Sequence, residues 1–531
     1  MQLVFNGVIH SIDPAYPHPE ALLIGDDGRI VAVGARDDLA ARAPGAQRID
    51  LGGQTLIPGF NDAHVHIWKL GLLLTVQVDA RKAVAPDIPS IVGRFRARAD
   101  ATSPETWLVG RGYNEAELPE RRHLTRQDLD AASTEHPIAL TRTCGHMIVA
   151  NSRALELAGI TRETPDPPGG TIVRDVQGEP TGLLQETAQG LLTRAIPLDD
   201  DRVMADAIRA AMDHQLALGI TSATDPLLTP FHLRVYHQLE AAGELRVRIN
   251  GLPIRRPDGG AETLPLPERY VSDTLRIDCV KFFADGGLSG ATAAISQPYK
   301  VTGQMGVLRF ETDELTALMW EAHSAGFRIG THAIGDVALD QVIGVYETLH
   351  RRMPIDSEGR PLFHRIEHLG LPSAEHLARC RAMHVIAVPQ TVFLHALGKT
   401  FRTYLPNDYY PRCYPVRAMI DAGLIVALSS DAPVVPDDNP LLGMKAALDR
   451  KDADGNSLAP EQAISPFEAL RAYTMGGAIA SGDADNRGSL SPGKWADMTV
   501  LSRDPLATPA DELPDITVSQ TWVGGELRYE A

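Results

Sequence analysis

Cysteine is scarce in this sequence of 531 residues. The four cysteines, Cys144, Cys279, Cys380 and Cys413, lie far apart and form no C-x-x-C pair. Secreted proteins that depend on disulfide bonds carry cysteine at a much higher density. We therefore expect no disulfide framework, and a reducing compartment suits the chain.

Long apolar segments are missing as well. No apolar run reaches the roughly 18 residues that a membrane-spanning helix requires. The N-terminal segment MQLVFNGVIHSIDP lacks the basic stretch and the following apolar stretch of a secretory signal peptide. We expect a cytoplasmic protein that has no membrane partner.

Positive charge is in deficit. The chain has 50 Lys and Arg against 68 Asp and Glu, which gives a formal net charge of −18 at pH 7. Such a surface repels phosphates, so nucleic acid is not an expected partner, which leaves a small-molecule substrate open. The length exceeds one ordinary compact core, which indicates a large domain with a smaller additional unit.

Two common catalytic signatures are also absent. The glycine-rich segments GDDG and VGGE do not precede a helix with phosphate-loop spacing, so both are interpreted as turns. No G-x-S-x-G motif is present, which argues against a serine hydrolase of that kind.

The pattern along the chain predicts strands at both ends and alternating strands and helices between them. MQLVFNGVIHSID and ALLIGDDGRIVAVG place Asn-Gly and Asp-Gly between apolar segments, which is typical of hairpins, and VSQTWVGGELRYE near the C-terminus is similar. In the middle, helices are expected over residues 201–218 and 312–326. The candidate strands cover residues 56–66, 136–144, 219–225, 276–285, 327–333, 362–370, 385–390 and 424–431.

Eight strands that alternate with helices predict an α/β protein built on a (β/α)8 TIM barrel. The segment from about 150 to 200 fits no strand–helix unit and contains the Gly/Pro-rich run TPDPPGGTIVRD. We interpret this segment as an insertion or a lid.

Polar residues at the ends of the candidate strands predict the chemistry, because barrel active sites lie at the carboxyl ends of the strands. His64 and His66 are at positions i and i+2, which share one face of a strand and can reach one metal. The other candidates at strand ends are His332, His368 and Asp431, and Lys281 lies inside an apolar run. These residue types suit a site of the zinc type.

Lys281 needs a separate explanation, because an ammonium group cannot bind a cation and is costly to bury. A desolvated lysine can lose its proton, and the neutral amine can add CO2 to give a carbamate. That carbamate is a carboxylate, which could bridge two divalent metals.

The segments DAHVH, DCVKFFADGG, THAIGD, RIEHLG and LSSDAP together resemble the amidohydrolase superfamily in its binuclear form with a carboxylated lysine. RTCGHMIVANSRALELAGI, KFFADGGLSGATA and HAIGDVALDQVI look like amidohydrolase family 3, the YtcJ-like metal-dependent hydrolases, which include N-substituted formamide deformylases. The resemblance covers nearly the whole chain. It implies a small β-sandwich formed by residues 1–57 and 488–531, around a barrel domain of residues 58–487 with the insertion.

The resemblance also implies the role of each residue. His64, His66 and Asp431 would bind the more buried metal, His332 and His368 the second, and carboxylated Lys281 both. One or two divalent ions, expected to be Zn²⁺, would be bound per chain. Asp431 would act as general base on a metal-bound hydroxide and return the proton to the leaving amine.

The implied activity is hydrolysis of a C–N bond other than a peptide bond, with an N-formyl or N-acyl amine as substrate. A cyclic amide or an ester such as a lactone is the alternative, because the same metal site would serve. A deaminase and a non-catalytic scaffold are less favoured: the deaminase branch usually lacks the bridging lysine, and scaffolds typically lose metal ligands. A homodimer is expected at the level of the family.

Several other polar residues could have either a functional or a structural role. HRIEH, from His364 to His368, matches the H-x-x-E-H zinc pattern, but that pattern needs a helix and a strand is expected here. Asp62 is expected to orient its loop, Asp285 to orient the lysine, and Asp336 to cap the following helix. The residues expected to contact substrate are His146, Trp68, Tyr113 and Arg412, and ordinary packing is the alternative for each.

Overall fold

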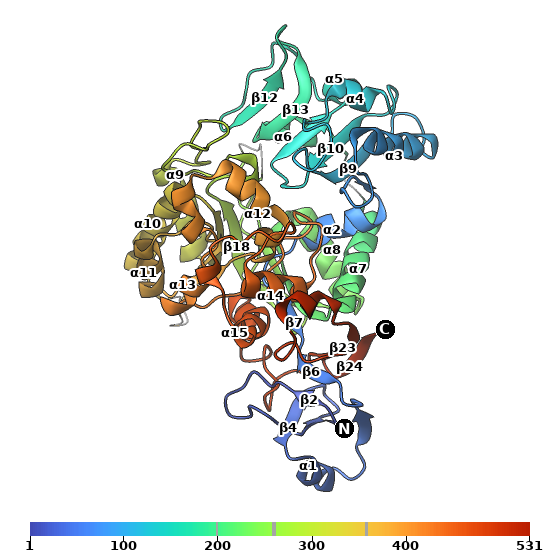
Figure 1. The fold of residues 1–531 in the computed structure, drawn as a ribbon, viewed down its shortest axis with the longest axis vertical. Coiled ribbons are helices and arrows are strands. Elements are labelled where there is room, and N and C mark those ends of the chain that lie inside the picture. The colour runs from blue at the N-terminus through green and yellow to red at the C-terminus, as the bar shows by residue number, and fades with distance from the viewer. Residues whose placement is uncertain (198–199, 258–261, 356–358, 360) are drawn as a thin grey trace.

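The computed structural model describes residues 1–197, 200–257, 262–355, 359 and 361–531. The two chain ends build one β unit, seen at the bottom of Figure 1. One of its sheets has the order β4-β3-β1-β5, and the other has the order β2-β6-β22-β23-β24. The strands are β1 (Gln2–Phe5), β2 (Val8–Ile9), β3 (Ala21–Ile24), β4 (Ile30–Gly34), β5 (Gln47–Asp50), β6 (Thr55–Pro58), β22 (Met498–Leu501), β23 (Val518–Val523) and β24 (Glu526–Glu530).

The second of these sheets joins the termini directly. β6 pairs antiparallel with β22, so that Met498 lies opposite Pro58 and Leu501 opposite Thr55. Side chains of both sheets, such as Val4 and Leu22 from one and Leu56 and Val500 from the other, share one apolar core. The structure therefore places strands from both ends of the chain in one unit.

A series of strands forms the centre of the molecule, and all of them are parallel except Tyr270–Val271, which pairs antiparallel with its neighbour. The first sheet has the order β16-β17-β15-β14-β7 and the second the order β18-β19-β20-β21. A parallel bridge between Ile254 and Lys281 connects the two sheets. The strands are β7 (Phe60–Asp62), β14 (Ile220–Leu228), β15 (Arg248–Pro253), β16 (Tyr270–Val271), β17 (Leu275–Ile277), β18 (Cys279–Phe283), β19 (Arg328–Ala333), β20 (Arg365–His368) and β21 (Ile386–Val388).

The eighth predicted strand, residues 424–431, makes single contacts with its neighbours and forms no continuous hydrogen-bonded pairing. Val426 makes one parallel bridge to Ala387 of β21. Ala63 N, just after β7, donates a hydrogen bond of 3.4 Å to Leu428 O. The central fold is mixed α/β with parallel strands, and its closure into a complete barrel stays a prediction.

Helices follow these strands and pack against them. They include α2 (Ile67–Thr75), α7 (Asp201–Ala217), α8 (Pro230–Ala241), α9 (Thr312–Ser324), α10 (Asp336–Arg352), α11 (Ala374–Ala382), α12 (Val392–Tyr404) and α14 (Pro440–Asp449). The two helices predicted from sequence are confirmed as α7 and α9. α2 and α7 pack closely at Gly71, where an added Cβ would lie 1.9 Å from Ala207 O. No helix in the described ranges is long and apolar enough to cross a membrane.

A third region forms its own sheet, with the order β12-β13-β11-β10-β9-β8. Figure 1 shows this region at the end of the molecule opposite the terminal β unit. The predicted strand 136–144 is wrong as a barrel strand, since β10 pairs here with β9 and β11. The place beside β14 is taken by β15, which the sequence analysis missed. The strands are β8 (Val78–Asp79), β9 (Leu108–Tyr113), β10 (Ile138–Arg142), β11 (Met147–Ala150), β12 (Gly170–Arg174) and β13 (Pro180–Glu186).

Candidate metal centre

Three predicted ligands meet in one buried cluster. The nearest ligand atoms of His64, His66 and Asp431 all lie within 4.8 Å of one another. Asp431 Oδ1 is 3.0 Å from His66 Nε2 and 3.5 Å from His64 Nε2. Two imidazoles and one carboxylate at this spacing are a suitable donor set for a divalent metal.

The backbone around this cluster is held by hydrogen bonds between the segment after β7 and the segment at Asp431. Asp431 N donates to His64 O at 2.7 Å, and His66 N donates to Ala432 O at 2.8 Å. Asp62 accepts from His64 N at 3.1 Å and from the Ser430 hydroxyl at 2.6 Å. The geometry thus supports the orienting role expected for Asp62.

Asp431 and His368 share an unusual backbone conformation. Their φ angles are 58° and 75°, in the left-handed region that side chains other than glycine rarely adopt. Such conformations cost about 1–3 kcal/mol each and are found preferentially at functional sites. His368 ends β20, and Asp431 lies in the segment that follows the bridge at Val426.

Glu367 orients His64 and was missed by the sequence analysis. Its Oε2 lies 2.5 Å from His64 Nδ1, which leaves His64 Nε2 to face the cluster. Arg365 Nε donates to Glu367 Oε1 at 2.5 Å, and both side chains are fully buried. Burial alone would raise the pKa of Glu367, but Arg365 and His64 hold it well below its usual value. A carboxylate behind a ligating histidine fixes the tautomer and the ring orientation.

His332 and His368 are the other two imidazoles predicted as metal ligands. His368 Nδ1 donates to Gln390 Oε1 at 2.6 Å, and Gln390 is itself oriented because it donates to Val388 O at 2.9 Å. His332 Nε2 donates to Gly286 O at 3.0 Å. These bonds leave one nitrogen of each ring with a free lone pair. The ring centroids of His332 and His368 are 4.4 Å apart, and those of His64 and His368 are 5.3 Å apart.

The protonation states suit metal binding. Burial lowers the pKa of all four imidazoles, so that they are neutral at pH 7 and can act as ligands. Burial alone would raise the pKa of Asp431, but His66, whose Nε2 lies 3.0 Å from Oδ1, and the neighbouring imidazoles hold it below its usual value. The cluster therefore combines neutral nitrogen donors with one anionic oxygen donor.

Lys281 is the member of the site that protein contacts explain least. Its side chain is 0% exposed, and its Nζ has no hydrogen-bond partner in the described part of the chain. Burial lowers the pKa of Lys281 to about 8, although Glu367 and Asp431 act in the opposite direction. An unpartnered buried amine is costly, so this position fits a modified or metal-bound group better than a free ammonium.

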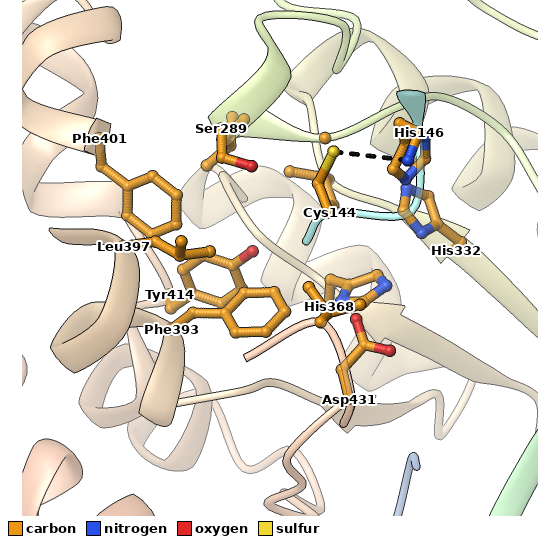
Figure 2. Close-up of a pocket in the computed structure, with 14 residues that line it drawn as sticks. Cys144, His146, Ser289, His332, His368, Phe393, Leu397, Phe401, Tyr414 and Asp431 are labelled. Carbon is orange, nitrogen blue, oxygen red and sulfur yellow. Dashed lines mark hydrogen bonds between the residues drawn. The ribbon is translucent and has the colours of Figure 1, made fainter. Parts of the chain in front are cut away.

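The pocket has a polar side and an apolar side. In Figure 2, the imidazoles of His146, His332 and His368 lie on one side with the carboxylate of Asp431. Phe393, Phe401, Leu397 and Tyr414 form the opposite wall.

His146 comes from the loop between β10 and β11 and reaches the pocket from the separate sheet. Its Nδ1 lies 3.0 Å from Glu186 Oε2, and Arg309 pairs with the same carboxylate at 2.9 Å. The His146 ring lies 5.8 Å from that of His332. The third sheet therefore supplies one wall of the site.

The other residues predicted to contact substrate lie elsewhere. Trp68 lines a larger neighbouring cavity and stacks on His232, with ring centroids 4.4 Å apart. Tyr113 is fully buried, and its hydroxyl lies 3.1 Å from His123 Nδ1. Arg412 pairs with Asp336 at 3.4 Å. The metal pocket is lined neither by Tyr113 nor by Arg412, and substrate contact by each stays a prediction.

Two carboxylates have different partners from those predicted. Asp285 accepts from Gly335 N at 2.8 Å and Ile334 N at 3.1 Å, so it holds the loop after His332 and not the lysine. Asp336 does not cap α10; it is the first residue of that helix and accepts from Ser296 N at 2.9 Å.

His364 lies outside the metal cluster. The segment from Arg365 to His368 is a strand, as predicted, so the helical zinc pattern has no support. His364 Nδ1 accepts from Ile329 N at 3.1 Å, and its Nε2 lies 3.0 Å from His323 Nδ1. The residue therefore has a complete set of structural partners.

Comparison with known proteins decides the family. A sequence model of the amidohydrolase family, Amidohydro_3, matches residues 47–529. The chain belongs to this amidohydrolase family. The enzyme is 31% identical to YtcJ of Bacillus subtilis (strain 168), over 99% of this chain and 98% of that protein. It is 30% identical to the N-substituted formamide deformylase of Arthrobacter pascens, over 99% of this chain and 98% of the relative.

Solved structures agree with this placement. The amidohydrolase resembles a metal-dependent hydrolase from Pyrococcus horikoshii OT3 with a TM-score of 0.77 and 26% identity, covering 96% of this chain and 99% of the other. A metal-dependent hydrolase from Pyrococcus furiosus gives a TM-score of 0.74 at 25% identity, covering 95% and 99%. The chain is thus an enzyme, a metal-dependent hydrolase of the amidohydrolase superfamily.

Proposed function

We propose that this amidohydrolase cleaves a C–N bond other than a peptide bond, in an N-formyl or N-acyl amine. The observation that carries the proposal is the convergence of the Lys281 amine, which has no hydrogen bond to the described residues, with four neutral imidazoles and the Asp431 carboxylate. The similarity to a relative named as an N-substituted formamide deformylase supports the choice of substrate class.

The donor set fits one or two divalent ions, and zinc is the ion that mixed imidazole and carboxylate ligands suit best. His64, His66 and Asp431 would hold one ion, while His332 and His368 would hold the other. Lys281, as the carbamate formed with CO2, would contact both. When bound, such a metal polarises the substrate carbonyl and lowers the pKa of water.

Asp431 is the proposed general base. Its carboxylate lies beside His66 in the pocket and is ionised, so it can accept a proton from the attacking water. The same carboxyl group then returns the proton to the nitrogen of the leaving amine. Glu367 keeps His64 in one orientation and tautomer during this exchange.

Metal analysis tests the proposed site first. On protein produced with added zinc and bicarbonate, we expect about two ions per chain, with a lower value in Lys281→Ala, because the bridging ligand is lost. His364→Ala is the matched control and should keep the wild-type content. No metal even after reconstitution would contradict the proposal.

A substrate panel tests the reaction. The panel compares N-formyl amines, N-acyl amines, cyclic amides and lactones at equal enzyme concentration. We expect the first two classes to be hydrolysed fastest and Asp431→Asn to remove that activity. Preferential turnover of lactones or cyclic amides would refute the proposed substrate class while leaving the metal site intact.

A further inference from the structure

A cavity of about 580 Å³ adjoins the metal pocket. It lies between α2, α8 and the third sheet, and apolar side chains such as Trp68, Leu72, Trp107 and Phe231 line much of it. Lys69, Arg98 and Arg111 are the charged residues on its wall, and no Asp or Glu is among the described residues that line it. The cavity is therefore apolar with positive charge.

Arg111 and Gly145 stand where the cavity meets the metal site. Both residues line the cavity and also the pocket that contains His64, His66 and Asp431. Gly145 has a φ of 76°, and a Cβ there would lie 3.3 Å from Arg111 Nη2. The absence of a side chain at Gly145 leaves space next to the guanidinium.

Arg111 lacks the partners that other buried arginines have. Arg111 is 6% exposed, and its Nε has no hydrogen-bond partner in the described ranges. Its Nη2 donates one long hydrogen bond of 3.5 Å to Thr143 O. Buried Arg142 and Arg365, in contrast, pair with Glu115 at 2.7 Å and Glu367 at 2.5 Å.

Arg450 shows how a buried guanidinium can be paired when none of the described carboxylates binds it. It donates to the backbone carbonyls of Cys413 and Tyr414 at 2.8 Å, and to two further carbonyls. Arg111 has no comparable set of acceptors among the described residues. Burial lowers the pKa of Arg111 to about 10, so the group is still charged at pH 7.

We propose that Arg111 binds a carboxylate group of the substrate, whose apolar part lies in the adjoining cavity. This inference rests on the proposed function and narrows its substrate class to amides that carry a carboxylate near the scissile bond. A planar guanidinium can hold a carboxylate through two parallel hydrogen bonds, which also orients the amide toward Asp431.

The kinetic test uses a matched pair of substrates, N-formylphenylalanine and its neutral carboxamide, with the holoenzyme. A charge-assisted hydrogen bond of the usual strength predicts a preference of about 10- to 100-fold in kcat/KM for the acid. Arg111→Gln should remove this preference and change kcat/KM for the carboxamide by less than about 3-fold. Arg111→Lys should retain part of it, because the charge remains but the paired geometry is lost.

Arg94→Gln is the matched control. Arg94 is exposed on the helix from Ile88 to Asp100, so the variant makes the same change in charge away from the cavity. It should retain the full preference for the acid. Equal kcat/KM values for acid and carboxamide in the wild type, or a preference that survives in Arg111→Gln, would overturn the proposal.

A binding measurement separates this proposal from the proposed function. If neither formamide is hydrolysed, that substrate class fails, and calorimetry with 3-phenylpropanoate and 3-phenylpropanamide tests Arg111 alone. We expect the acid to bind the wild type at least about 10-fold more tightly than the amide, with that difference lost in Arg111→Gln. If 3-phenylpropanoate contacts only the metal, the wild type and Arg111→Gln will bind it equally well. That result would refute the Arg111 site.

Folding of the variant is checked by its melting temperature. Arg111 has no ionic partner to lose in the described ranges, so Arg111→Gln should melt at or above the wild-type temperature. A lost preference in a variant that melts normally supports a binding role and not a structural one.

Discussion

Replacement of Glu367 by glutamine tests the arrangement behind the metal site most directly. Glutamine keeps the size of the side chain but removes the charge that lies between Arg365 Nε and His64 Nδ1, each at 2.5 Å. Two effects should follow, because the same carboxylate orients a ligand and neutralises a buried cation.

The first effect is on metal affinity. Loss of a carboxylate behind a ligating histidine typically weakens metal binding by about 10- to 100-fold. The second effect is on the stability of the metal-free protein. Arg365 is 0% exposed, so its charge would be left without a counterion, at a cost of about 3 kcal/mol or more.

Both effects are measurable on purified protein. Zinc affinity is obtained by titration against a competing chelator, and the free energy of unfolding by urea denaturation of the metal-free protein. Glu347→Gln is the control, since Glu347 pairs with Arg379 at 2.8 Å on a partly exposed helix face. Such a surface pair contributes about 1 kcal/mol or less. Wild-type zinc affinity and stability in Glu367→Gln would refute the role assigned to this carboxylate.

Three further changes test the site and the fold. Asp431→Asn should lower kcat by at least about 100-fold in a steady-state assay, because the general base is lost; a smaller effect would exclude that role. His368→Ala should reduce metal content by elemental analysis, whereas His364→Ala should not, and equal losses would contradict the assignment of ligands. Gly71→Ala should destabilise the protein to urea by about 1–3 kcal/mol, because an added Cβ meets Ala207 O at 1.9 Å; unchanged stability would show that α2 and α7 can separate freely.

Several of the parallel strands were predictable from the alternation of strand-like and helical segments. Segments 219–225, 327–333 and 385–390 correspond to β14, β19 and β21. β15 was missed because its interior is polar: Arg248 pairs with Asp497 at 2.7 Å, and Asn250 donates to Thr224 at 3.2 Å.

The segment 136–144 shows the opposite error. Its residues Ile138, Ala139 and Leu140 are as apolar as a barrel strand, and they do form β10. Local pattern cannot say which sheet a strand joins, since that depends on partners distant in sequence. Here the partners are β9 and β11, which belong to the third sheet.

His64, His66, His332 and His368 could be proposed as metal ligands from sequence, because each stands at or near the end of a strand-like segment. The roles of Glu367, Gln390 and Arg111 could not be predicted, because their importance comes from what they contact in three dimensions or fail to contact. The order of letters in RIEHLG does place Glu367 beside His368. It does not reveal that Glu367 faces His64, 303 residues earlier in the chain.

The pairing of β6 with β22 constrains when the protein can fold during its synthesis. Thr55–Pro58 is synthesised 440 residues before its antiparallel partner Met498–Leu501. β6 must therefore wait for that partner before its sheet can be completed. The candidate metal centre has a similar delay, because Asp431 is synthesised 367 residues after His64.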